Sequence, residues 1–197
     1  MRTLLYTRAM KLIFAQGNPE PDYSLSRHNA GFLVLNTIVT MHGAKWTNKT
    51  KFDAIVAEVK IDGQKVILAK PTTYYNDTGI SARKLIDFYK LDTANDLLII
   101  HDDLSLPFGT IRIRKQGGDA GNNGIKSINT HVDSPYTRIK IGIAIESEVK
   151  MDDATFVLAK FSNQELGILI EKVIPQTIKL TTQFCNNSIE HTSHKIS

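Results

Sequence analysis

The chain of 197 residues contains a single cysteine and no long apolar run. Cys185 has no partner for an internal disulfide, and one cysteine cannot build a cysteine-rich metal site. No apolar stretch reaches the roughly 18 residues of a membrane span. The first ten residues, MRTLLYTRAM, are too weakly apolar for a secretory signal. We therefore expect a cytoplasmic protein with no membrane partner, in which residues 1–10 are an extension before the first strand.

Several sequence motifs of enzyme chemistry are also missing. The chain has no G-x-S-x-G nucleophile elbow, no Walker A sequence, no G-x-G-x-x-G fingerprint and no H-E-x-x-H zinc motif. His28, His101 and the carboxylates near them lack the spacing of a common metal site. We therefore expect neither a metal nor another cofactor, and a hydrolytic reaction would use water as its nucleophile.

The composition is ordinary for a globular protein, but the charge is unevenly distributed. Hydrophobic residues make up 42% and charged residues 22% of the chain, and the net charge is +4. From Thr110 to Lys140, two acidic residues stand against six basic ones: Arg112, Arg114, Lys115, Lys126, Arg138 and Lys140. A solvated strand face explains this excess on charge alone, and a nucleic-acid-binding surface is the alternative.

Segments typical of strands and helices alternate along the chain. Apolar runs and alternating patterns predict strands over residues 11–16, 53–61, 65–70, 96–101, 109–115 and 138–144. The sequence DGQ between the second and third of these is a strong hairpin signal. Apolar residues at helical spacing predict helices over 31–43, 78–90 and about 163–185. We expect one α/β domain over residues 11–185, a central mixed β-sheet flanked by α-helices, followed by a flexible tail over 186–197.

Polar clusters follow four of the predicted strands. Their side chains are Asn18, His28 and Asn29; Asn76; His101, Asp102 and Asp103; and Asn122 and Asn123. Taken singly, each cluster is explained by solvation or by turn chemistry. Ligand sites of open α/β sheets form at the carboxyl ends of strands, so together the clusters predict one site.

The residue types in these clusters suit hydrolysis by an activated water. A neutral imidazole is the natural general base near neutral pH, and His28 and His101 are the candidates. Such a base needs a carboxylate on its other ring nitrogen, which Asp102 or Asp103 could supply. Asparagine amides both donate and accept hydrogen bonds, which suits a peptide backbone and can help to stabilise an oxyanion.

In this order, the four loops resemble those of bacterial-type peptidyl-tRNA hydrolases. GNPEPDYSLSRHNAG is similar to the family's G-N-P-G-x-x-Y-x-x-T-R-H-N-x-G, and KPTTYYNDTG to K-P-x-T-[FY]-M-N-x-[ST]-G. HDDLSLPFG matches H-D-[ED]-L-D-L-P-x-G, and QGGDAGNNGIKSI matches G-G-G-x-[GA]-G-H-N-G-[LI]-[RK]-S-I. RIKIGIA and FVLAKF match two further segments. The resemblance extends from Lys11 to about Phe184, and so many motifs in register are very specific.

The resemblance implies an enzyme that cleaves the ester between a peptide and the 3′ ribose of tRNA, recycling tRNA from stalled peptidyl-tRNA. It implies that His28 is the general base and Asp102 its carboxylate partner. Contacts to the peptide backbone and the tRNA acceptor end are then expected from Asn18, Tyr23, Tyr75, Asn76, Asn122 and Asn123. Arg114 and Lys140 fall at the positions that clamp the tRNA 5′ phosphate. The resemblance also implies a monomer without a cofactor.

The chain departs from the family pattern at several positions, and three of them bear most directly on this site. Tyr75 replaces a methionine, which adds bulk and a hydroxyl group to the cleft. Asn122 replaces a histidine that supports water and substrate positioning in the family. Asp119 adds a negative charge, which either weakens binding of the tRNA end or is paired with Lys115 or Arg114. None of these changes removes the expected base or its carboxylate.

Two other functions fit parts of the pattern. A non-catalytic RNA-binding relative, of the kind found among chloroplast splicing factors, would keep the fold and much of the site. A small peptidase or amidase on an α/β scaffold would have no need of the basic stretch. The complete set of His28, Asp102 and three asparagines favours the hydrolase, and hydrolysis of a peptidyl-tRNA would discriminate it from the RNA-binding relative.

Overall fold

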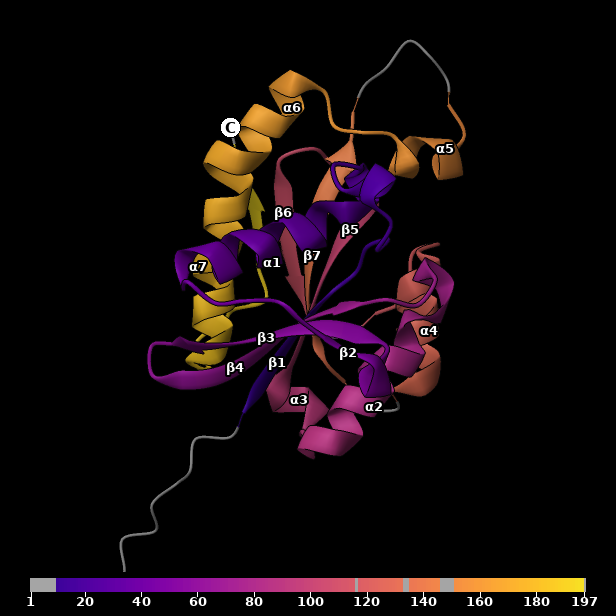
Figure 1. Ribbon diagram of the computed structural model, residues 1–197. Coiled ribbons are helices and arrows are strands. Elements are labelled where there is room, and N and C mark those ends of the chain that lie inside the picture. The colour runs from indigo at the N-terminus through magenta and orange to yellow at the C-terminus, as the bar shows by residue number, and fades with distance from the viewer. Residues whose placement is uncertain (1–9, 116, 133–134, 146–150, 197) are drawn as a thin grey trace, which may run out of the picture.

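The computed structural model describes residues 10–115, 117–132, 135–145 and 151–196, which form a sheet covered by helices (Figure 1). The strands are β1 (Lys11–Ala15), β2 (Thr47–Lys49), β3 (Ala54–Ile61), β4 (Gln64–Pro71), β5 (Leu97–Pro107), β6 (Thr110–Arg114), β7 (Thr137–Ala144) and β8 (Ser193–Lys195). The α-helices are α1 (Ala30–Met41), α2 (Thr78–Tyr89), α3 (Thr93–Asp96), α4 (Asn123–His131), α5 (Asp153–Leu158), α6 (Asn163–Ile168) and α7 (Ile174–Cys185). Short 3-10 helices are η1 (Pro21–Tyr23), η2 (Arg27–Asn29), η3 (Thr50–Phe52) and η4 (Tyr75–Asp77), and the π-helical segment η5 (Leu169–Val173) joins α6 to α7.

The sheet is mixed, as predicted, and within the described ranges it has eight strands in the order β2-β3-β4-β1-β5-β7-β6-β8. Its centre is parallel, because β1 pairs with β4 and β5, and β5 pairs with β7. The remaining pairs are antiparallel. The carboxyl ends of β4, β1 and β5 therefore meet at one edge of the sheet, where the loops with Asn18, His28 and Asn76 begin. Because β6 is antiparallel to β7, the loop that carries Asn122 begins at the opposite edge.

The hairpin predicted from DGQ is β3 and β4. Asp62 and Gly63 form its turn with φ angles of 47° and 77°, a left-handed pair that matches the twist of the two strands. The strand predicted over 96–101 is longer than expected. In the structure β5 continues to Pro107, because β7 runs beside it and pairs with Asp102 and Asp103. These carboxylates therefore lie on a strand and not in the loop after it.

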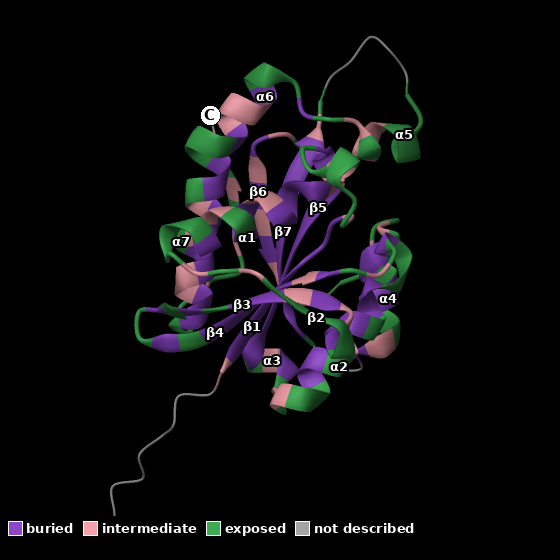
Figure 2. Ribbon diagram, viewed as in Figure 1, coloured by how far each residue is buried: buried purple, intermediate pink, exposed green. Residues whose placement is uncertain are grey.

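Apolar residues on the two faces of the sheet form two cores (Figure 2). The two faces of β5 illustrate this arrangement, since Leu98 and Ile100 pack in one core while Leu97 and Ile99 pack in the other. The helices α1 and α7 cover the first core, and α2 and α4 cover the second (Figure 1). With both faces covered, β5 carries the continuous apolar run that identified it in the sequence.

The two ends of the chain compare differently with expectation. The helix predicted over about 163–185 is the continuous stretch α6, η5 and α7. The tail predicted to be flexible over 186–197 instead includes β8, which pairs with the free edge of β6 and brings Ile189 and Ile196 against the first core. Of the expected extension over residues 1–10, only Met10 lies in the described ranges, and it packs against the second core. Within these ranges no helix is long and apolar enough to cross a membrane.

Candidate active site

A cavity of about 450 Å³ lies beside the carboxyl ends of β1, β4 and β5. All four predicted loops contribute to its wall. Of the residues predicted for the site, those lining the cavity are Asn18, His28, Tyr75, Asn76, Asp102, Asn122 and Asn123. The remaining wall includes Asp103, Asp119 and the helix α5, which contributes Asp153, Val157 and Leu158. The cavity is therefore polar on the sheet side and partly apolar on the side of α5.

His28 and Asp102 form a hydrogen-bonded pair in this cavity. His28 lies in η2, directly before α1, and its Nδ1 is 2.8 Å from Oδ2 of Asp102 on β5. The side chain of Asp102 is 2% exposed and that of His28 is 14% exposed. A hydrogen bond from Nδ1–H to the carboxylate leaves Nε2 of the neutral ring as its free acceptor. This arrangement is that of a histidine base with an orienting carboxylate.

The loop that carries Asn18 is held by a residue whose role the sequence analysis did not identify. The side-chain oxygen of Asn29 accepts from the backbone N–H of Asn18 at 2.7 Å, and its amide nitrogen donates to the backbone carbonyl of Asn18 at 2.9 Å. Asn29 is buried, so both of its polar groups are used inside the protein. Its position directly after His28 in the sequence RHN was the available signal. Asn29 thereby couples the position of Asn18 to that of the histidine.

A second anchor fixes η2 from the other side. Arg27 is buried and donates through Nη2 to both carboxylate oxygens of Glu165, at 2.7 and 2.8 Å, and through Nη1 to the carbonyl of Lys160 at 2.7 Å. Its guanidinium lies 4.5 Å from the ring centre of Phe156. Glu165 also completes the capping box of α6 with Ser162, a pattern that the sequence SNQE displays. Arg27 therefore holds this loop in shape, and Glu165 is a partner that the sequence analysis did not identify.

The alternative pair, His101 and Asp103, is arranged for other contacts. His101 is buried away from the cavity with its Nδ1 2.6 Å from the backbone carbonyl of Asp102, and desolvation lowers its pKa from 6.5 to about 4. Asp103 accepts from Nζ of Lys140 at 2.7 Å and from Oγ of Ser105 at 2.6 Å. Although burial acts in the opposite direction, these hydrogen bonds keep the pKa of Asp103 below its ordinary value. The geometry therefore singles out His28 and Asp102 among the candidates.

Tyr75 contacts both members of this pair. Its ring is stacked on the imidazole of His28, with centroids 3.7 Å apart and an interplanar angle of 15°. Its hydroxyl lies 3.1 Å from Oδ1 of Asp102, the oxygen that His28 does not use. The amide nitrogen of Asn122 lies 2.9 Å from the same hydroxyl. Tyr75 and Asn122, which the sequence analysis described as two separate departures from the family pattern, are therefore direct neighbours.

The loop before α4 is built by local hydrogen bonds. The side chain of Asn122 caps α4 by accepting from the N–H of Ile125 at 3.0 Å. The carboxylate of Asp119 accepts from the N–H of Gly121 at 2.9 Å, and among the described residues it forms no ion pair with Lys115 or Arg114. The charge of Asp119 thus closes a turn, whereas the sequence analysis considered weakened tRNA binding or a pairing with a basic residue.

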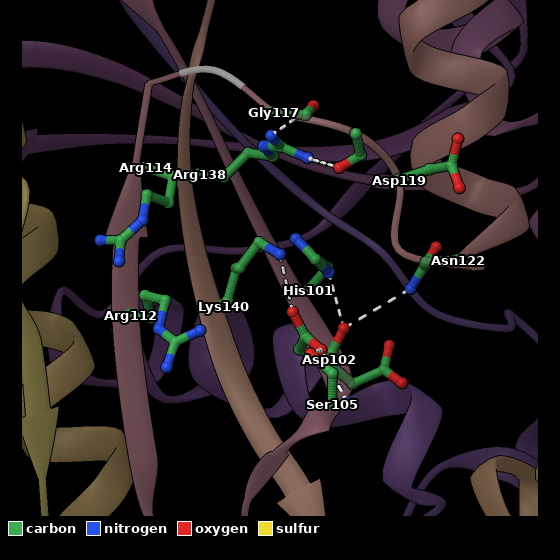
Figure 3. Close-up of polar contacts among 12 residues, drawn as sticks. His101, Asp102, Ser105, Arg112, Arg114, Gly117, Asp119, Asn122, Arg138 and Lys140 are labelled. Atoms are coloured by element: carbon green, nitrogen blue, oxygen red, sulfur yellow. Dashed lines mark hydrogen bonds and ion pairs between the residues drawn. The ribbon is translucent and has the colours of Figure 1, made fainter.

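Four of the six basic residues lie on β6 and β7, and β7 is the neighbour of β5 (Figure 3). Lys115 follows β6, and Lys126 lies in α4. Arg138 is 2% exposed and donates to the carbonyls of Gly117 and Gly118, so it holds the loop before α4 from inside the protein. Lys140 is paired with Asp103. Arg112 stands directly opposite Lys140 in the register, and Arg114 stands opposite Arg138. Arg138 is therefore a structural residue. Arg112, Arg114 and Lys140 form a cluster on the same face of the sheet.

Three of the predicted site residues are not part of the cavity wall. Tyr23 lies in η1, before the turn that leads to His28. Arg114 donates to the carbonyls of Ile113 and Thr192, at 2.7 and 3.4 Å, and Lys140 points to Asp103. The two residues of the expected phosphate clamp therefore lie outside the cavity wall, as diagonal neighbours on adjacent strands. Among the described residues, no group of three or more His, Cys, Asp or Glu side chains gathers as a metal site requires.

Comparisons with known proteins agree with this arrangement. The family model of peptidyl-tRNA hydrolases matches residues 12–197. A peptidyl-tRNA hydrolase of Ligilactobacillus salivarius is 41% identical over 157 residues, which are 79% of this chain and 83% of the relative. The enzyme of that name from Thermosynechococcus vestitus is 43% identical over 164 residues, 80% of each chain.

Solved structures support the same conclusion. The crystal structure of peptidyl-tRNA hydrolase from Acinetobacter baumannii superposes with a TM-score of 0.83 at 30% identity, covering 91% of this chain and 90% of that one. The predicted α/β fold and the predicted family resemblance are both confirmed. With a matching family model, curated relatives and a shared fold over most of its length, this chain belongs to the peptidyl-tRNA hydrolase family.

Proposed function

We propose that this protein hydrolyses the ester bond between a peptide and the 3′ ribose of tRNA, with His28 as the general base that activates water. Membership of the family supports the substrate. The observation that carries the mechanism is the hydrogen bond of 2.8 Å between Nδ1 of His28 and Oδ2 of Asp102 on the cavity wall. It leaves Nε2 available to a water molecule in the cavity.

The proposed reaction needs only groups of this chain and one water. Nε2 of His28 takes a proton from the water as its oxygen attacks the ester carbonyl carbon. A tetrahedral intermediate forms, and Asp102 stabilises the imidazolium produced in this step. When the bond to the ribose 3′ oxygen breaks, the imidazolium returns the proton to that oxygen. The products are a free peptide acid and deacylated tRNA, and the histidine is neutral again.

The asparagines are proposed to bind the peptide part and to place the water. Asn18, Asn76 and Asn123 come from three different loops and line the same cavity as His28. Their side-chain amides can pair with both the N–H and the carbonyl groups of a peptide backbone. Contacts with the backbone do not read side chains, so one site of this kind accepts many peptide sequences. A donor among them would also stabilise the oxyanion of the tetrahedral intermediate.

The 5′ phosphate of tRNA is proposed to bind at Arg114 and Lys140, next to Arg112. Nζ of Lys140 lies 2.7 Å from the carboxylate of Asp103. A phosphate would therefore either share the ammonium group with this carboxylate or displace it. Binding by a few cations makes affinity dependent on salt and independent of base sequence. The biological role that follows is the recycling of tRNA in translation, by a cytoplasmic and monomeric enzyme. Tyr23 is proposed to shape the site of the tRNA end.

The test is release of deacylated tRNA from an N-blocked aminoacyl-tRNA, with and without excess EDTA. Wild type should be active and resistant to the chelator. His28→Ala should lose about 10²- to 10⁴-fold in rate, the contribution of a general base. His42→Ala is the matched control, because His42 is an exposed histidine at the end of α1, and it should keep wild-type activity. Well-folded wild type that binds tRNA without hydrolysing it would contradict the proposal and favour the RNA-binding alternative.

A further inference from the structure

The contacts of Tyr75 suggest more than a cleft-lining role. Tyr75 is 7% exposed, and its ring covers one face of the imidazole of His28 at a centroid distance of 3.7 Å. Its hydroxyl reaches Oδ1 of Asp102 while His28 reaches Oδ2, at 3.1 and 2.8 Å. A buried carboxylate requires partners for both oxygens, and Tyr75 and His28 together supply them. Asp102 is thus shared by the histidine and the phenol.

The direction of each hydrogen bond follows from the way Asn122 is fixed. Its side-chain oxygen accepts from the N–H of Ile125 at 3.0 Å and lies 3.2 Å from the phenol oxygen. Its amide nitrogen lies closer to the phenol oxygen, at 2.9 Å, and donates to it. The single hydroxyl proton of Tyr75 is then directed to the stronger acceptor, the carboxylate of Asp102. A relay of donors therefore runs from α4 through Asn122 and Tyr75 to Asp102.

The surrounding structure leaves Tyr75 little freedom. A Cβ added at Gly124 would lie 2.6 Å from Cε1 of the tyrosine ring, so only glycine at that position accommodates the ring. The backbone carbonyl of Tyr75 accepts from Oγ1 of Thr78 at 3.1 Å, which ties η4 to the start of α2. Burial, and next the charge of Asp102, raise the pKa of Tyr75 well above its ordinary value. The phenol therefore stays protonated and remains a donor over the working pH range.

We propose that Tyr75, held by Asn122, is a positioning residue for the His28–Asp102 pair: its ring orients the imidazole and its hydroxyl shares the charge of Asp102. This inference rests on the function proposed above. Tyr75 acts through its neighbours and takes no proton in the reaction. The two departures from the family pattern then form one hydrogen-bonded unit.

The hydroxyl should have a measurable effect on the pH dependence of hydrolysis. Its hydrogen bond draws electron density from the carboxylate and so weakens the attraction between Asp102 and a protonated His28. Without it, Asp102 attracts an imidazolium more strongly, and the acidic limb of kcat/KM moves upward. The other titratable groups on the cavity wall are Asp103 on β5, Asp119 before α4 and Asp153 in α5, and a change at Tyr75 leaves them in place.

The experiment compares Tyr75→Phe with wild type in the deacylated-tRNA assay from about pH 5.5 to 8.5. Tyr75→Phe keeps the stacked ring and removes the donor. We expect the acidic limb to move up by about one unit, with kcat/KM reduced up to about tenfold at pH 6 and less at pH 8, the scale of a hydrogen bond to a charged group. Asn122→Ser keeps a helix-capping side chain but loses the amide donor, so it should move the limb in the same direction. In the double variant the effects should not add, because both act on one relay.

Tyr136→Phe is the matched control. Tyr136 is a second buried tyrosine whose hydroxyl bonds to an asparagine, Asn129, at 2.6 Å, but it lies outside the cavity wall. Its loss should lower stability without moving the pH profile. A Tyr75→Phe profile that is unchanged, or lowered equally at every pH, would overturn the inference while wild-type hydrolysis still supported the function. If Tyr75→Phe is unstable, a normal profile for Asn122→Ser would overturn it instead. Absence of hydrolysis by wild type would overturn the function itself.

Discussion

Replacing Arg27 with methionine should destabilise the protein through a charge that is left buried. The side chains of Arg27 and Glu165 are 7% and 12% exposed, and they form two hydrogen bonds of 2.7 and 2.8 Å. Methionine fills much of the space against Phe156 but leaves the carboxylate of Glu165 without its cation. Because η2 carries His28 next to Arg27, the same change should also displace the candidate base.

The size of the effect follows from the geometry. Removing one member of a buried ion pair costs about 3 to 5 kcal/mol. Glu165 keeps its hydrogen bond from the N–H of Ser162 and has some access to water, so we expect the lower end, about 3 kcal/mol. For a chain of this size, 1 kcal/mol lowers the melting temperature by about 2–4 °C, so the expected fall is about 6–12 °C. Changing Glu165 to leucine as well should recover part of the loss, because the unpaired charge is then gone.

Thermal unfolding followed by the fluorescence of Trp46, the single tryptophan, measures this difference. Arg83→Met is the matched control, since Arg83 pairs with Asp87 on the exposed surface of α2. An exposed pair of this kind contributes about 0.5 kcal/mol or less. If the melting temperatures of Arg27→Met and Arg83→Met fell by the same small amount, the pairing of Arg27 with Glu165 would not be the support that its geometry indicates.

Three further predictions concern other parts of the site. Lys140→Gln and Arg114→Gln should each reduce the slope of log kcat/KM against log salt concentration by about 1, as expected for one lost phosphate contact and measured with tRNA-linked substrate. The stability of wild type should fall as the pH drops from 6.5 to about 4, because the unfolded chain protonates His101 while the folded chain keeps it neutral. Urea titrations should show a loss of up to about 3 kcal/mol in the free energy of unfolding, and His101→Gln should not show this loss. Asn29→Ala should leave both backbone groups of Asn18 without partners and cost about 2 kcal/mol in urea unfolding.

The parts of the fold that the sequence predicted well are those dominated by apolar patterns. The runs that became β1, β4 and β5 are buried on both faces, so their composition alone separates them from loops. The turn at Asp62 and Gly63 needs left-handed backbone angles, which DG supplies. The four loops of the site were found because strand ends carried polar residues in place of apolar ones.

What could not be predicted depends on partners that are distant in the chain. β8 has no apolar pattern of its own, and it is a strand because the edge of β6 offers it backbone partners. The pairing of Lys140 with Asp103, and not with a free ligand, depends on which strands are neighbours. The hydroxyl of Tyr75 meets Asp102 and Asn122 only after α2 and α4 have packed, so the sequence indicated an added hydroxyl but not its target.

Both borders of the sheet have a common design that bears on self-association. The outermost strands, β2 and β8, are three residues long, and each ends with a lysine, Lys49 and Lys195. A long, flat border strand is a template on which another chain can add a strand, whereas short and charged borders discourage it. The longer strands β3 and β6 are each shielded by such a short strand. At high concentration, the protein should therefore resist the edge-to-edge aggregation to which open sheets are prone.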